Sequence, residues 1–194
     1  MEPALALLEF DSIAIGIVAG DGMVKRAPVQ RIVSGTVQPG RYLVMVTGDV
    51  ASVEEAVRAG KEIGAAALSD AVFLPNVHPD VVTALAGETT GELHDALGVI
   101  ETRTVPAALV AADAGLKGAA VALLQLRLAD GLGGKGLALF TGLVSDVEAA
   151  VELATAVAST QLIRQVVIPQ LHGEMWQNVG GNGRFGAHLN WGNF

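Results

Sequence analysis

The segment Ala4-Leu5-Ala6-Leu7-Leu8-Glu9 decides the fold of this chain, because Ala96-Leu97-Gly98-Val99-Ile100-Glu101 repeats it 92 residues later. Both segments are apolar and both end in a glutamate. A chance match would not keep one offset over a long stretch, so the chain contains an internal repeat. The offset also relates four further pairs, which are Asp21 and Asp113, Lys25 and Lys117, Ala27 and Ala119, and Val29 and Val121.

Later in each repeat the offset becomes 94, because the second copy carries a two-residue insertion before Gly134. A period of this length indicates tandem domains rather than a solenoid of short repeats. We therefore predict a first domain at 1–87, a polar linker at 88–95, a second domain at 96–179 and a Gly- and Asn-rich tail at 180–194. The new offset relates Thr47, Glu54, Pro75 and His78 to Thr141, Glu148, Pro169 and His172.

Each repeat shows the same order of elements. The first copy predicts strands at 5–10, 29–37 and 42–47 and a helix at 13–25. The second copy predicts strands at 97–102, 121–128 and 137–141 and a helix at 105–117. With a second helix, a fourth strand and a short terminal helix, the order is β-α-β-β-α-β plus a helix. That order is typical of ferredoxin-like α+β folds, so we predict two of them in tandem.

The ends of the later elements carry local signals. Ser52-x-x-Glu55 predicts a capping box at the start of the second helix, and Ser145-x-x-Glu148 predicts the same in the second copy. The fourth strand is predicted to end at Pro75 or Pro169, because proline has no backbone N–H to donate. His78 and His172 follow at the short terminal helix, where recurrence favours a structural role such as capping or an edge hydrogen bond.

Composition excludes several classes of function. The 194 residues include 12 Lys+Arg, 20 Asp+Glu and no Cys, which gives a net charge of −8. Without cysteine there is no disulfide, no thiolate zinc site and no cysteine nucleophile. The negative charge disfavours a nucleic-acid surface. No signal peptide and no membrane-spanning segment is expected. Hydrophobic residues make up 51% of the chain, which predicts apolar area buried between subunits.

Four segments resemble the bacterial microcompartment shell domain, and the chain as a whole resembles its tandem, trimer-forming class. They are the residues 21–29 (Asp-Gly-Met-Val-Lys-Arg-Ala-Pro-Val), 36–42 (Thr-Val-Gln-Pro-Gly-Arg-Tyr), 47–50 (Thr-Gly-Asp-Val) and 72–78 (Val-Phe-Leu-Pro-Asn-Val-His). Each has a counterpart in the second repeat. The resemblance is greatest to the single-layer propanediol-utilisation type.

The resemblance implies a structural protein rather than an enzyme. Three chains would form a six-lobed, homotrimeric tile with a central pore for small metabolites. Such tiles would pack edge to edge with other shell proteins around enclosed enzymes, in the bacterial cytoplasm. The resemblance assigns the tile edge to Lys25, Lys117, His78 and His172. It assigns the pore loops to Thr36, Val37, Gln38, Pro39, Gly40, Asp130, Gly131, Leu132, Gly133 and Gly134.

The sequence departs from the propanediol-utilisation type at a residue that binds that type's cofactor. In that type a cysteine precedes the Pro-Gly pair of the first pore loop, and three such cysteines hold an iron–sulfur cluster on the trimer axis. Here the position is Gln38, and an amide is a poor substitute for a thiolate. We therefore expect no cofactor, and the same change disfavours a reading of the chain as an electron-transfer tile.

Other chemistry finds little support in the sequence. The run 131–136 (Gly-Leu-Gly-Gly-Lys-Gly) fits neither a P-loop nor a dinucleotide fingerprint, and it leads into a strand. The four histidines lack the spacing of a zinc site, so no metal is expected. Recurrence of Glu9 and Glu101 at strand ends indicates architecture, and no nucleophile, base and oxyanion donors come together. The alternative function is a trimeric ferredoxin-like sensor that binds a small ligand between its subunits.

Overall fold

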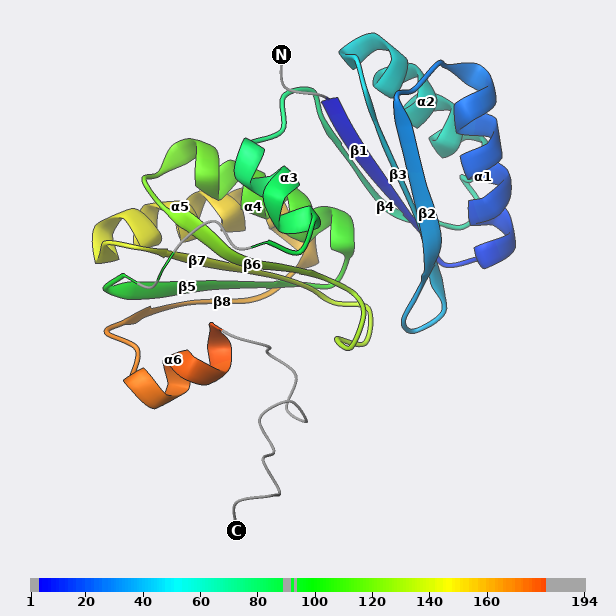
Figure 1. The fold of residues 1–194 in the computed structure, drawn as a ribbon. Coiled ribbons are helices and arrows are strands. Elements are labelled where there is room, and N and C mark those ends of the chain that lie inside the picture. Colours follow the sequence, from blue (N-terminus) through cyan, green and yellow to red (C-terminus); the bar gives the residue numbers. More distant parts are fainter. Residues whose placement is uncertain (1–3, 89–91, 93, 181–194) are drawn as a thin grey trace.

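The computed structural model describes residues 4–88, 92 and 94–180, and these form two similar α+β domains side by side (Figure 1). The first domain contains β1 (Ala4–Phe10), α1 (Ile13–Arg26), β2 (Arg31–Val37), β3 (Arg41–Gly48), α2 (Val50–Ile63), β4 (Leu68–Leu74) and α3 (Pro79–Leu85). The second contains β5 (Ala96–Thr102), α4 (Val105–Gly118), β6 (Ala122–Leu128), β7 (Gly136–Gly142), α5 (Val144–Ala158), a 3-10 turn (Ser159–Gln161), β8 (Leu162–Pro169) and α6 (Gly173–Val179).

Each domain is built on one antiparallel four-stranded sheet. The strand orders are β2-β3-β1-β4 in the first sheet and β6-β7-β5-β8 in the second, so equivalent strands of the two repeats occupy equivalent places. Ala4 lies opposite Gly48 in the first sheet, and Ala96 lies opposite Gly142 in the second. The β-α-β-β-α-β order with a terminal helix is therefore confirmed, because the same hydrophobic pattern produces the same register in both copies. The linker prediction falls partly on residues 89–91 and 93, and the tail prediction on 181–194; these lie outside the described residues.

The two faces of the first sheet pack against different partners. Alternate side chains of a strand point to opposite faces. On β1, Leu8 and Phe10 face α1 and α2 and form one core cluster. Leu5 and Leu7 face the other way and join a cluster that also contains residues of the second domain, such as Leu109. The central strand of the first domain is therefore buried on both faces, and one hydrophobic core runs across the domain boundary.

The two predicted capping boxes are wrong. Asp49 directly follows β3, and its carboxylate accepts the Ser52 N–H at 2.9 Å, so α2 begins one turn earlier, at Val50. Ser52 is then inside the helix, and Glu55 pairs with Arg58 on its surface. In the second copy α5 begins at Val144, after Leu143, which has no capping side chain. In both copies the strand leads into the helix too directly for the later serine to be the first residue.

The strand and helix ends near the prolines agree with the predictions. β4 ends at Leu74, just before Pro75, and β8 ends at Pro169. His78 is the N-cap of α3, and its Nδ1 accepts the Asp80 N–H at 3.2 Å. His172 caps α6 in the same way, with Nδ1 at 3.4 Å from the Glu174 nitrogen. The recurrence of the two histidines is therefore explained by helix capping.

Candidate functional site: the paired loops and the domain boundary

The two predicted pore loops come from different domains and lie against each other at one end of the molecule (Figure 1). Gly131 donates its backbone N–H to Gln38 Oε1 at 3.3 Å. A Cβ placed on Gly134 would lie only 2.7 Å from Pro39 Cδ and 3.1 Å from the Gln38 carbonyl oxygen. The structure thus brings together two loops that are more than 90 residues apart in sequence.

The two loops reach this contact through different turns. In the first loop Gly40 has a φ of 111° and donates to the Val37 carbonyl at 2.9 Å, which closes the hairpin between β2 and β3. In the longer second loop Gly131, Gly133 and Gly134 all have positive φ, a conformation that glycine adopts without steric cost. Thr36, Gln38, Pro39, Gly40, Asp130, Gly131 and Gly133 are exposed, Val37 and Leu132 are half-buried, and Gly134 is buried.

The first loop is anchored at its base by a buried carboxylate. Arg41 follows the loop directly, and its Nη1 donates to Glu9 Oε1, while its Nε lies 3.3 Å from Asp11 Oδ1. Glu9 is fully buried, and its other oxygen, Oε2, accepts the Val105 N–H at 2.7 Å. Burial raises the pKa of Glu9 above 4.5, against the lowering effects of the Val105 N–H and of Arg41.

Glu9 therefore joins the first loop to the second domain. Val105 is the first residue of α4, and such a residue's N–H has no partner within its own helix. A carboxylate there also meets the positive end of the helix dipole. The recurrence of Glu9 predicts an architectural role but not this cap across the domains. No local signal reveals it, because the bond joins residues 96 positions apart.

The second loop repeats the anchor without the cap. Lys135 ends this loop, and its Nζ donates to Glu101 Oε1 at 2.7 Å. The Glu101 side chain is 30% exposed, whereas that of Glu9 is 0% exposed. The repeat thus places the same carboxylate twice, once inside the domain boundary and once on an open surface.

The predicted edge residues fall into two different environments. Asp113 accepts the His78 N–H at 2.8 Å, and Lys117 donates to Asp113 at 2.6 Å and to the Asn76 carbonyl of the first domain. Lys117 therefore lies at the outer margin of the domain boundary, with 40% of its side chain exposed. Lys25, its counterpart, pairs with Asp21 of its own helix at 2.5 Å, and its side chain is 73% exposed.

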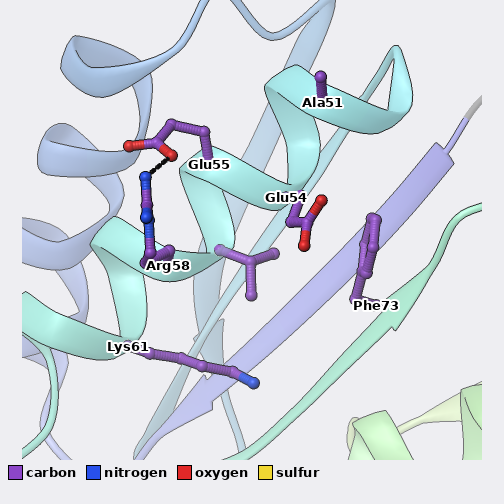
Figure 2. Close-up of a pocket in the computed structure, with 7 residues that line it drawn as sticks. Ala51, Glu54, Glu55, Arg58, Lys61 and Phe73 are labelled. Atoms are coloured by element: carbon purple, nitrogen blue, oxygen red, sulfur yellow. Dashed lines mark hydrogen bonds and ion pairs between the residues drawn. The ribbon is translucent and has the colours of Figure 1, made fainter.

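Two surface hollows that are lined by described residues do not resemble an active site. One, of about 570 Å³, lies between the exposed side of α2 and Phe73 of β4, and Figure 2 shows its rim of Glu54, Glu55, Arg58 and Lys61. Glu55 and Arg58 pair with each other there. The second hollow, of about 330 Å³, lies between β4 and α4 at the domain boundary. Within residues 4–88, 92 and 94–180, no three His, Asp or Glu side chains are grouped to hold a metal ion.

The geometry of the two domains agrees with comparisons to known proteins. The BMC domain model matches residues 4–77 and again residues 96–171. The chain is 39% identical to the bacterial microcompartment shell protein PduT of Citrobacter freundii over 181 residues, which are 92% of this chain and 98% of that protein. A solved microcompartments protein from Desulfitobacterium hafniense DCB shares 40% identity, with a TM-score of 0.78 over 91% of this chain and 99% of that one.

A more distant structure supports the fold alone. The fused permuted hexameric shell protein of the RMM microcompartment is 18% identical, with a TM-score of 0.58 over 80% of this chain and 83% of that one. The family itself rests on the two domain matches and the 39% relative.

The chain belongs to the BMC-domain family of bacterial microcompartment shell proteins, and to its tandem-domain class. Its role is structural, in the shell of a microcompartment within the bacterial cytoplasm. The resemblance inferred from the four sequence segments is thus confirmed. In the part of the chain that the structure describes, no helix combines the length and the apolar character needed to cross a membrane.

Proposed function

We propose that the chain forms a homotrimeric tile in which the paired loops of three copies surround an axial pore for small polar metabolites. The observation that carries the proposal is the direct contact between the loops of the two domains, through Gln38 and Gly131 and through Pro39 and Gly134. Loops that meet at one end of the tandem pair can line one opening when copies are arranged around an axis. The tile is a structural element and no reaction is assigned to it.

The chemistry of the loops favours the passage of polar molecules through the pore. Gln38 Oε1 is occupied by the Gly131 N–H, which leaves the two donors of its amide group for a passing molecule. Asp130 is exposed beside it and opposes the entry of anions. Three copies of this set would form a polar rim with donors and one carboxylate each, suited to small neutral or cationic molecules.

The residues at the pore do not fit an iron–sulfur cluster. Such a cluster needs thiolate ligands, and the chain contains no cysteine. The side-chain oxygen of Gln38, Oε1, already accepts a hydrogen bond from the Gly131 backbone N–H of the second loop. We propose that the pore carries no metal cofactor and passes metabolites instead of electrons.

The outer edge of the tile is proposed to include Lys25 and Lys117, with the helix caps His78 and His172 behind them. Lys117 already shows how such a lysine can bind, because its ammonium group reaches the Asn76 carbonyl of a neighbouring lobe. A long flexible stem allows the same contact with carbonyl groups of an adjacent tile. Other shell proteins are the expected partners at this edge, and enclosed enzymes are expected at one face.

Electron microscopy of the purified protein at high concentration tests the proposal. Hexagonal tiles or sheets with a central opening are the expected result, alone or with partner shell proteins. The Lys25→Ala variant should keep the same particles but lose the sheets, because an exposed ion pair contributes little to the particle itself. Small separate particles that never tile under either condition would contradict the proposal and favour the ligand-binding sensor.

A further inference from the structure

The larger of the two surface hollows has the size and the mixed lining of a small-molecule site. Its volume is about 570 Å³, and ligand pockets have volumes of about 300–1,000 Å³. Val57, which is 6% exposed, and the half-buried Phe73 give it an apolar surface. Glu54 and Lys61 are exposed at its rim and carry opposite charges. The hollow therefore combines an apolar surface with available charges of both signs.

The charges of Glu54 and Lys61 have no partner in the described part of the chain. Glu55 beside them accepts from Arg26 with one carboxylate oxygen and from Arg58 with the other. This pairing engages the guanidinium group of Arg58, the cation nearest to Glu54 in sequence. The carboxylate of Glu54 and the ammonium group of Lys61 form no hydrogen bond or ion pair with the residues that the structure describes. Both groups can therefore bind an added molecule.

Helix geometry places these two charges on one side of α2. Glu54 and Lys61 are seven residues apart, which is two helical turns and about 10.5 Å along the axis. Figure 2 shows both side chains directed from α2 toward the side on which Phe73 lies. The lysine stem is long and flexible, so its ammonium group can reach back along the helix and shorten the gap between the charges. The pair is suited to a molecule that is charged at both ends.

The fold itself does not require the lysine or the aromatic ring of this hollow. At the equivalent places of the second domain, Thr155 replaces Lys61 and Val167 replaces Phe73. The second domain forms the same helix and the same strand with these residues, as α5 and β8. The carboxylate alone recurs, as Glu148. The combination of a carboxylate, an ammonium group and a ring is therefore a feature of the first domain and not of the repeated frame.

We propose that this hollow binds a small zwitterion of the ω-amino acid type, with its ammonium group at Glu54 and its carboxylate at Lys61. The ammonium end lies between the Glu54 carboxylate and the Phe73 ring, and aromatic rings attract cations. The carboxylate end accepts charge-assisted hydrogen bonds from the Lys61 ammonium group. The methylene chain between the two ends covers Val57 and removes apolar surface from water. The site binds its ligand and no reaction is assigned to it.

The two charges together select the ligand. A simple cation would be repelled by Lys61, and a simple anion would be repelled by Glu54. A molecule with both charges satisfies both side chains at once. In an α-amino acid the two charged groups are attached to one carbon, which is too close for side chains two turns apart. A chain of several methylene groups between the charges fits this spacing, and 6-aminohexanoate is a suitable probe.

Saturation-transfer difference NMR of the full-length protein with 6-aminohexanoate tests the site. We expect saturable binding with a dissociation constant of about 1 mM, which is ordinary for a small ligand in an open hollow. Hexanoate and hexylamine have the same carbon chain and only one charge, so each should bind at least about tenfold more weakly. No saturable binding of 6-aminohexanoate, or equal binding of either singly charged probe, would overturn the proposal.

Variants locate the ligand in this hollow. Glu54→Gln and Lys61→Thr should each weaken binding about tenfold, because each removes one charge. Phe73→Val should weaken it about threefold, because it removes the ring. The threonine and the valine are the residues that the second domain has at these places, so the fold accommodates them.

The matched control is Glu148→Gln, the same change at the equivalent place of the second domain, and it should bind 6-aminohexanoate as the wild type does. Circular dichroism checks that every variant is folded. Equal binding by the wild type, Glu54→Gln and Lys61→Thr would overturn the site. The lining residues all belong to the first domain of one chain, so this test does not depend on whether three copies form a tile.

Discussion

The contact between the two predicted pore loops can be tested with a single methyl group at Gly134. This residue has a φ of 88°, and a Cβ there would lie 2.7 Å from Pro39 Cδ and 3.1 Å from the Gln38 carbonyl oxygen. Gly133 provides a matched control, because it has a φ of 63° and no atom lies within 4 Å of its Cβ position. Both variants to alanine have the same backbone cost, and only Gly134→Ala has the steric cost.

The two costs have different magnitudes. A non-glycine residue in the left-handed region costs about 1–2 kcal/mol, so Gly133→Ala should lower the free energy of unfolding by about that amount. Overpacking adds about 1–3 kcal/mol, so Gly134→Ala should lower it by about 2–5 kcal/mol in total. For a chain of this size each kcal/mol lowers the melting temperature by about 2–4 °C. We therefore expect Gly134→Ala to melt about 2–12 °C below Gly133→Ala.

Differential scanning calorimetry of the three proteins at one concentration measures this difference. Native mass spectrometry alongside shows whether the oligomer is retained, so that a change in assembly is not mistaken for a change in the loop. Equal melting temperatures for Gly133→Ala and Gly134→Ala would refute the loop contact, because the steric cost exists only if Pro39 lies against Gly134.

Variants at three further residues test the anchors and caps. Glu9→Gln should cost about 2 kcal/mol at neutral pH, because the amide NH2 group would face either the Arg41 donor or the Val105 N–H and leave it without an acceptor. Because burial raises the pKa of Glu9, the folded state holds the proton more tightly than the unfolded state does. As the pH rises above 4.5, the wild type should therefore lose stability relative to Glu9→Gln in urea titrations. A stability difference that stays constant with pH would contradict this. Hydrogen bonds from Ser52, mainly from its side chain and then from its backbone, lower the pKa of Asp49 below 3.8. The wild type should therefore melt at a higher temperature than Asp49→Ala above pH 3.8, and this difference should shrink as the pH falls further. His78→Ala should cost about 1 kcal/mol while His78→Asn stays close to the wild type, because asparagine can cap α3; equal losses in calorimetry would argue against the cap.

Much of the fold was predictable because it depends on short-range patterns that occur twice. Alternating and helical hydrophobic periods predicted the strands and helices, and the repeat offset confirmed each by its copy. The prolines predicted the ends of β4 and β8, and the recurring histidines predicted the caps of α3 and α6. The first capping box failed because two local signals competed, and Asp49, nearer to the strand, was the one in position. The second failed because β7 leads almost directly into α5, which begins without a capping side chain.

The role of each repeated residue was decided only by tertiary structure. Glu9 and Glu101 occupy equivalent positions of the sequence repeat. Glu9 is nevertheless buried and caps α4, whereas Glu101 is partly exposed and pairs with Lys135. Asp113 and Asp21 differ in the same way. By itself the sequence determined that there are two equal domains, because local periodicity is a property of each copy. The packing of one domain against the other decided which surfaces are buried, because it brings together groups that lie about 35 to 96 residues apart in sequence. A short-range sequence pattern cannot predict contacts between residues so far apart.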